Sequence, residues 1–600
     1  MLPVSMKDLV NLRHLDIGGI GLHEMPKGMS KLKSLQFLSG YVVGKHEENK
    51  IKELGALANL HDSIWIDKLE DVVDSSEALE ARMFDKNSIN SLSLWWSVNK
   101  DENTVDSQME SDILDKLRPH TNLKELQIRG YRSTTFPDWL GHSLYHNIIT
   151  MKLGDCRNCC KLPSLGQLPS LKHLSISDFG SVEIVGAEFY FYHYDESCLE
   201  TPFPNLETLS FVSMRCWKEW RSLEYNAFPR LRELTISSCP MLRGDLPSQL
   251  PSLQSLQIKC CKQLSSCLPR APALTSLSIE DGNKARIEEL PPLLRELSIA
   301  GKHEVEWVVE AIMHMQLTCL TSLWIENCSS HISFPVSCIP ASLQELTIQH
   351  CRKLEFQMDG QHYSLKELSI HSSCDSVTSF SLLDSFPNLV RVDIRNCKNM
   401  ECIVVSRSLS CLRSLIIRYC RSLKSVSTLW MAASQLEHLT VLECPEIELC
   451  PTGDGDPHRS LRSLSISYCE KLGNSEAFMN SQFHGLTHLN IEGGSGESVK
   501  CFPKEGWLPA SLESLSLERI QSVETLQCKG LAHLTSLQKL SIEYCPKLEN
   551  IEGEKLPASL IRLFINRSRL LGKRLETKDP QVWPKISHIP GIQVNYTWIW

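Results

Sequence analysis

One short motif recurs along the chain and constrains its fold more than any other feature. A leucine, two residues, a second leucine, one residue and an aliphatic residue occur first as LRHLDI at residues 12–17 and last as LIRLFI at 560–565. Clear copies are spaced roughly 20 to 26 residues apart, which is the period of leucine-rich repeats. The alternation predicts a short strand whose spaced aliphatic side chains face a core and whose intervening residues face solvent.

Stacked copies of this strand predict an α/β repeat solenoid. We expect a leucine-rich-repeat horseshoe with a parallel β-sheet on its concave face. Many repeats open with an apolar residue and a proline, as at Phe203-Pro204 and Phe386-Pro387. Proline cannot donate a backbone hydrogen bond, so these pairs predict strand entrances and a convex side of mostly loops and short helical turns.

Breaks in the repeat period predict insertions within one continuous array. The acidic stretch 97–111 is expected to be a loop, since it has few large apolar residues. The aromatic stretch 183–203 has two interpretations, an insertion packed against the solenoid or a loop that contacts a partner. The chain divides into N-terminal repeats with a truncated start (1–66), an irregular insertion with a short helix and the acidic loop (67–111), repeats (112–182), the aromatic insertion (183–203), regular repeats (204–566), and a C-terminal cap and tail (567–600).

Many of the 24 cysteines share one repeat position, three residues after the last aliphatic residue of the motif. A small side chain that tolerates burial and donates weakly to the loop backbone suits this position. Because no signal peptide is apparent, we expect free, structural thiols in a reducing compartment. The cysteines in this register are Cys156, Cys239, Cys261, Cys328, Cys351, Cys397, Cys420, Cys444, Cys469 and Cys545.

Composition and motifs disfavour several functional classes. The 62 basic and 71 acidic residues give a net charge of −9, which does not indicate nucleic-acid binding. No apolar run is long enough to span a membrane, so we expect a cytoplasmic protein. His142 and His146 precede the pair Cys156 and Cys159, but a predicted strand separates the two pairs, and we expect no metal site. No catalytic constellation is apparent, so we expect neither an enzyme nor a bound cofactor.

The solvent-facing strand positions predict a surface that binds a protein ligand. Large apolar residues at these positions are the most informative, because exposing them lowers solubility and aromatic anchors often dominate interfaces. For each of them, local packing is the alternative. The candidate binding residues are Trp65, Trp95, Lys124, Gln127, Lys172, His173, Arg232, Trp324, Gln344, Lys366, Ile416 and Phe564.

Longer strings resemble one family over nearly the whole chain. The most specific is CRNCCKLPSLGQLPSLKHLSI at 156–176, followed by FPNLETLSFVSMRCWKEW at 203–220. Residues 69–96 and the tail WPKISHIPGI at 583–592 add to it. They resemble the leucine-rich-repeat domain of plant coiled-coil nucleotide-binding (NLR) disease resistance proteins. The resemblance implies a cytoplasmic sensor that recognises a pathogen effector or a guarded host protein and restrains the nucleotide-binding domain of the full-length receptor.

The chain departs from that family in lacking the phosphate-binding motif GxxxxGK[ST]. We therefore expect ADP or ATP to bind only in a nucleotide-binding domain that is missing from this chain. One alternative is a truncated, non-signalling fragment. Another is a substrate adaptor for ubiquitination, which needs an adaptor-binding helical module that we do not find. A receptor-kinase ectodomain needs repeated LxGxIP, and only residues 242–247 come close.

Overall fold

The computed structural model describes residues 2–97, 107–191, 201–223, 227–264, 268–280, 290–315, 317–448, 460–469, 483–493 and 500–599. The chain divides into two compact units, unit 1 (Met1–Ala311) and unit 2 (Ile312–Trp600). Each unit is described by itself.

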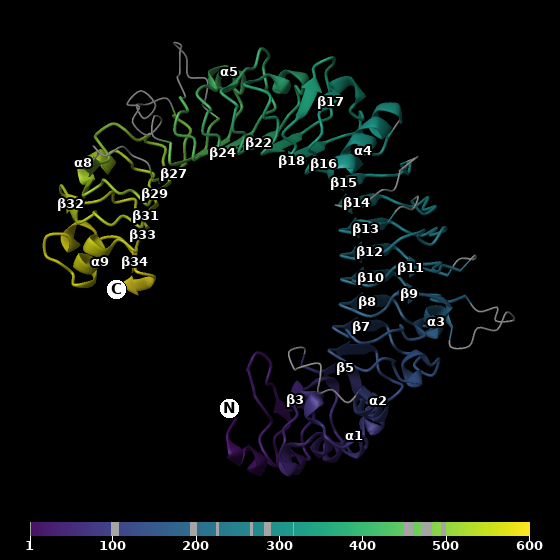
Figure 1. Cartoon of the computed structure of the whole chain (residues 1–600). Helices are drawn as coiled ribbons and strands as arrows, with labels where there is room; N and C mark the ends of the chain where they lie inside the picture. The colour runs from purple at the N-terminus through teal and green to yellow at the C-terminus, as the bar shows by residue number, and fades with distance from the viewer. Residues whose placement is uncertain are drawn as a thin grey trace. The chain divides into compact units, whose positions relative to one another are not determined.

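The sheet of unit 1 consists of parallel strands, each paired with the next along the chain (Figure 1). A separate parallel pair, β1 (His14–Leu15) and β2 (Phe37–Leu38), precedes it. The strands of the sheet are β3 (Gly40–Val42), β4 (Asp62–Asp67), β5 (Ile89–Trp95), β6 (Glu125–Arg129), β7 (Thr150–Gly154), β8 (His173–Ser177), β10 (Thr208–Val212), β12 (Glu233–Ser237), β13 (Ser255–Lys259), β14 (Ser276–Glu280) and β15 (Glu296–Ala300).

The sheet of unit 2 repeats this arrangement, and its last strand is antiparallel. Its strands are β16 (Ser322–Glu326), β18 (Glu345–Gln349), β20 (Glu367–His371), β22 (Arg391–Arg395), β24 (Ser414–Arg418), β25 (His438–Leu442), β26 (Ser463–Ser467), β27 (His488–Glu492), β29 (Ser514–Glu518), β31 (Lys539–Glu543), β33 (Arg562–Asn566), β34 (Gly591–Val594) and β35 (Thr597–Ile599).

The register places the motif's aliphatic residues side by side in the core. In unit 1, Leu126 pairs with Met151 and Ile128 with Leu153, and all four are buried. In unit 2, Leu368 pairs with Val392 in the same way. The predicted parallel sheet of a leucine-rich-repeat solenoid is therefore confirmed.

The outer side of each unit, opposite the sheet, contains the predicted loops and short helical turns, and it also carries short parallel strands that the sequence did not predict. Its strands are β9 (Ile184–Val185), β11 (Glu219–Trp220), β17 (Ile332–Pro335), β19 (Leu354–Gln357), β21 (Ser379–Phe380), β23 (Cys402–Ile403), β28 (Cys501–Phe502), β30 (Thr525–Gln527) and β32 (Asn550–Glu552). The α-helices are α1 (Ser75–Glu80), α2 (Ser107–Lys116), α3 (Ala187–Tyr190), α4 (Lys302–His314), α5 (Ser427–Ala432), α8 (Cys528–Leu531) and α9 (Arg569–Glu576). The 3-10 turns are η1 (Val4–Asp8), η2 (Met29–Lys31), η3 (Glu47–Asn49), η4 (Ile51–Ala56), η5 (Leu69–Asp71), η6 (Met83–Asp85), η8 (Asp138–Gly141), η9 (Leu165–Gln167), η10 (Val336–Cys338), η11 (Leu382–Ser385) and η12 (Trp583–Lys585).

The repeated cysteines close the turn at the end of each strand. The Sγ of Cys239 donates to the carbonyl of Ser237 at 3.4 Å, and that of Cys351 donates to the carbonyl of Gln349 at 3.2 Å. All ten cysteines of the register are buried and have free thiols. Burial raises the pKa of Cys351 to about 12, so its thiol stays protonated at neutral pH. The predicted role, a small buried donor to the loop backbone, is confirmed.

The insertion in unit 1 differs from its prediction in one respect. The acidic stretch 97–111 was expected to be a loop throughout, but its last residues, 107–111, begin helix α2. Ile113 and Leu114 on this helix are buried, so packing of its apolar side decides the structure. Residues 98–106 lie outside the described residues. Glu110 of α2 is buried and accepts hydrogen bonds from the backbone N–H and from Nε of Arg132, at 2.8 and 2.9 Å.

The described aromatic residues of the stretch 183–203 pack inside unit 1. Phe189, Tyr190 and Phe203 are buried, and the indole Nε1 of Trp220 donates to the Tyr190 hydroxyl at 2.8 Å. Tyr192 and Tyr194 lie outside the described residues. For the part that the structure describes, the packing interpretation accounts for these side chains.

Candidate protein-binding face

The outward side chains of the strands form aligned rows, because the strands pair in a constant register from repeat to repeat, apart from one shift between Asp62 and Ser63 at the start of β4. We call this exposed side the sheet face, and we call the position between the two buried residues of each strand the central row. Trp65 and Gln127 lie in the central row of unit 1. Trp324, Ile416 and Phe564 lie in that of unit 2.

The other predicted residues lie on the same faces in different rows. His173 is the first residue of β8, and Trp95 is the last residue of β5. The remaining five stand immediately before a strand, at the rim of the sheet face, and all but the half-buried Gln344 are exposed. They are Lys124, Lys172, Arg232, Gln344 and Lys366.

Trp65 and Trp95 form a stacked pair on unit 1. Their ring centroids are 5.7 Å apart and their planes differ by 11°. Trp65 also lies against Gly40, where a Cβ atom would come within 1.9 Å of the indole. Both side chains are half-buried. The pair therefore combines local packing with a partly accessible aromatic surface.

Trp324 is the most exposed of the predicted apolar candidates. Its side chain is 41% exposed, and its Nε1 donates to Glu326 Oε2 at 3.3 Å. Phe564 is half-buried, because its ring packs against Trp598, with the two ring centroids 5.9 Å apart. Lys539 Nζ lies 5.4 Å from the centroid of the Phe564 ring.

Ile416 corrects one sequence expectation. It has the predicted outward register, but it is only 9% exposed. Asp393 and Thr440 are its register partners on the neighbouring strands, and Asp393 is itself buried. The side chain is therefore covered within the row rather than presented to a ligand, which was the packing alternative.

Ion pairs between neighbouring repeats compensate two of the cations on the unit 1 face. Arg129 Nε lies 2.7 Å from Asp155 Oδ2, and Lys172 Nζ lies 3.1 Å from Glu207 Oε1. The hydrogen bond from Lys172 lowers the pKa of Glu207. His173 Nδ1 lies 3.0 Å from the hydroxyl of Thr208. Such exposed pairs contribute little to stability, but they leave the local surface near neutrality.

A different arrangement occupies the unit 2 face. Three successive strands, β20, β22 and β24, end in His371, Arg395 and Arg418, which are register partners. Sequence reasoning missed this row of basic residues because it treated large apolar residues at outward positions as the most informative candidates. The signal was available, since each of the three residues directly follows the last aliphatic residue of its repeat.

A second row missed by sequence reasoning lies further along unit 2. The last residues of β27, β29 and β31 are Glu492, Glu518 and Glu543, again in register. Arg519 and Arg567 lie over the ring of Tyr544, with guanidinium carbons 5.2 and 4.9 Å from its centroid. This part of the face therefore combines a row of carboxylates with an aromatic ring and two guanidinium groups, and Arg519 forms an ion pair with Glu492.

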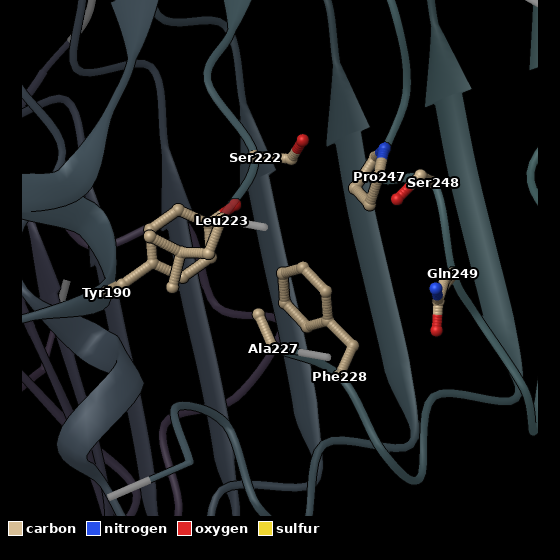
Figure 2. Close-up of a pocket in the computed structure, with 8 residues that line it drawn as sticks. All are labelled: Tyr190, Ser222, Leu223, Ala227, Phe228, Pro247, Ser248 and Gln249. Atoms are coloured by element: carbon tan, nitrogen blue, oxygen red, sulfur yellow. The ribbon is translucent and has the colours of Figure 1, made fainter. Parts of the chain in front are cut away.

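The described residues contain no group of three or more His, Cys, Asp or Glu side chains that could hold a metal. Cys159 Sγ donates to the carbonyl of Ser133 at 2.9 Å, as part of the loop structure. Figure 2 shows a small pocket in unit 1 beside the aromatic cluster. It has room for about one water molecule, so no cofactor fits there. Its lining residues are Tyr190, Ser222, Leu223, Ala227, Phe228, Pro247, Ser248 and Gln249.

No helix within the described part of the chain is long and apolar enough to cross a membrane.

Comparisons with known proteins relate the chain to plant disease resistance proteins. The family model described as R13L1/DRL21 LRRs matches residues 51–179. The putative disease resistance protein At3g14460 of Arabidopsis thaliana is 26% identical over 94% of this chain and 53% of the relative. The putative disease resistance RPP13-like protein 1 of the same species is 32% identical over 60% of this chain and 32% of the relative.

A solved structure, that of CroV588, described as a novel circular LRR protein, aligns with a TM-score of 0.49 at 15% identity over 93% of this chain and 85% of that chain. Among the curated relatives, the chain spans about half the length of At3g14460 and a third of the RPP13-like protein. The motifs, the family model and the curated relatives agree that the chain is similar to the leucine-rich-repeat region of plant coiled-coil nucleotide-binding (NLR) disease resistance proteins.

Proposed function

We propose that this chain is the recognition region of a plant intracellular immune receptor. Its ligand is a pathogen effector or a guarded host protein, bound in the cytoplasm through side chains of the sheet face. In the full-length receptor, the same region contacts the nucleotide-binding domain. Recognition requires no catalysis by this chain and no cofactor of its own.

The observation that best supports this proposal is the exposed Trp324 in the central row of unit 2. Tryptophan is enriched among residues that dominate protein interfaces, and an exposed indole on a regular sheet face has no role in the core. The neighbouring outward residues differ from repeat to repeat, which suits selective recognition of one partner. The similarity to plant disease resistance proteins supports the immune context.

Two alternatives remain distinct from this proposal. A substrate adaptor for ubiquitination uses the same kind of face, but co-purifies with a ubiquitin ligase subunit. A truncated, non-signalling fragment triggers no defence response when it is joined to a nucleotide-binding domain, whether or not it binds the ligand.

The test is proximity labelling of partners in plant cells with the whole chain. Trp324→Ala should lose the specific partner, whereas Met431→Ala on α5 should retain it. Met431 is a suitable control because it is 47% exposed on the outer side of the same unit. An identical partner set for all three proteins contradicts the proposed binding face.

A further inference from the structure

The row of His371, Arg395 and Arg418 brings basic side chains of three successive strands together on the sheet face of unit 2. Each side chain stands at the end of its strand and points outward, with its register partner on the next strand at about the 4.8 Å inter-strand spacing. Arg391, at the start of β22, is exposed on the same face. The row thus places two guanidinium groups and one imidazole side by side across three repeats, and the imidazole is charged only when it is protonated.

Two carboxylates lie beside this row. Glu367 is the register partner of Arg391, and Asp393 pairs with Arg395. Asp393 is 3% exposed and accepts two hydrogen bonds from Arg395, from Nε at 2.8 Å and from Nη2 at 2.5 Å. His371 Nε2 is 3.8 Å from Asp393 Oδ1, which is too far for a hydrogen bond. Asp393 therefore neutralises Arg395, whereas no carboxylate in the described part of the chain forms an ion pair with Arg418.

Two nitrogen atoms of the row are covered from solvent but have no hydrogen-bond partner among the described residues. They are Nε of Arg418 and Nε2 of His371. Leaving a buried polar group unpaired costs free energy. A carboxylate that docks on the row can pair with these groups after small side-chain rotations, and guanidinium groups bind carboxylates with two parallel hydrogen bonds.

We propose that the row of His371, Arg395 and Arg418 binds an acidic segment, rich in Asp or Glu, of a protein ligand. This inference rests on the proposed function and specifies the chemistry of the ligand. Charge complementarity favours an acidic segment at this place, and the net charge of −9 disfavours its binding elsewhere on the chain. Further along the face Glu492 is paired with Arg519, while the carboxylates of Glu518 and Glu543 disfavour an acidic segment at β29 and β31.

His371 makes the binding dependent on pH. Burial lowers its pKa below the ordinary value, and the positive charges of Arg395, His350 and Arg418 lower it further, while Asp393 raises it. A docked carboxylate favours the protonated imidazole, so binding takes up a proton. The affinity should therefore rise as the pH falls from about 7.5 to about 6, where glutamate side chains stay ionised.

Isothermal titration calorimetry of the whole chain with an eight-residue oligoglutamate peptide tests this proposal. We expect Arg418→Gln to weaken binding about tenfold, as loss of one close charge pair does. Arg352→Gln is the matched control, because Arg352 lies outside the strands of unit 2, is exposed and is paired with Asp375. It should change the Kd less than about twofold. Titration in two buffers of different ionisation enthalpy should show proton uptake, and His371→Gln should abolish it.

Several outcomes overturn the proposal. They are absence of oligoglutamate binding, equal binding of oligolysine, an unchanged Kd in Arg418→Gln, or preferential binding of a phosphoserine peptide that oligoglutamate cannot match. Undiminished proton uptake in His371→Gln contradicts the role of that side chain. If Trp324→Ala loses the partner but Arg418→Gln does not change the Kd for oligoglutamate, the proposed protein-binding face is supported and the proposal of an acidic ligand is wrong.

Discussion

The sheet faces of the two units share one backbone pattern but differ in how their charges are compensated. On unit 1, Arg129 and Lys172 each pair with a carboxylate from a neighbouring repeat. On unit 2, two arginines and one histidine of neighbouring repeats lie beside the buried carboxylate of Asp393, which pairs with Arg395. Outward positions do not pack in the core, so the repeat permits either arrangement. The charge pattern, rather than the fold, distinguishes what each face can bind.

The largest expected effect concerns the cysteine position that both units share. Burial raises the pKa of Cys351 to about 12, whereas Cys216 is exposed. Because the thiolate is the reactive form, Cys351 should react with iodoacetamide at pH 8 at least about a thousandfold more slowly than Cys216. Mass spectrometry of the native chain measures both rates. Comparable rates contradict the tight closure of the strand ends.

A buried charge pair of unit 1 should have the largest effect on stability. Glu110→Ala leaves Arg132 without its carboxylate partner in a mostly buried site. We expect a loss of about 3–5 kcal/mol in the local free energy of unfolding. Hydrogen exchange of α2 and of the loop after β6 measures it. Unchanged protection there shows that solvent screens the pair.

On unit 2, removal of the Asp393 carboxylate should increase the contrast between the faces. Asp393→Asn keeps the side-chain shape but frees the charge of Arg395, so oligoglutamate should bind about threefold more tightly. Because Arg395 is partly exposed, the loss of stability should be only about 1–2 kcal/mol. Calorimetry and hydrogen exchange of β22 report the two effects. Weaker binding of the peptide shows that Asp393 orients Arg395 for the ligand.

The smallest effect is expected for an exposed pair of unit 1. Glu207→Gln removes the partner of Lys172 and should change the free energy of unfolding by less than about 1 kcal/mol. Lys172 lowers the pKa of Glu207 in the folded chain. The ion pair therefore stabilises the fold at pH values above the pKa that Glu207 has in the unfolded chain. This stabilisation is lost as the pH falls through the pKa of Glu207 in the folded chain. The free energy of unfolding, measured by chemical denaturation, should therefore differ less between pH 7 and pH 3 in Glu207→Gln than in the unchanged chain. Gain of oligoglutamate binding contradicts the need for a row of cations.

Sequence reasoning predicted the repeat solenoid, the parallel sheet, the loop-rich outer side and the structural cysteines. It assigned the candidate residues to strand positions, whereas five of them stand immediately before a strand. It missed the start of α2, because buried contacts from other segments stabilise this helix in a stretch of acidic composition. It placed Ile416 in the correct row but with the wrong exposure.

The fold follows from the sequence alone because the spacing of the leucines specifies both the period of two within a strand and the stacking of one repeat on the next. Exposure and charge balance on the sheet face follow only from the tertiary structure. The environment of Trp324, Ile416 or Arg418 is set by residues of adjacent repeats, which the chain brings into register across a turn of the solenoid. Electrostatic interactions and packing act between these spatial neighbours, so a local motif cannot specify them.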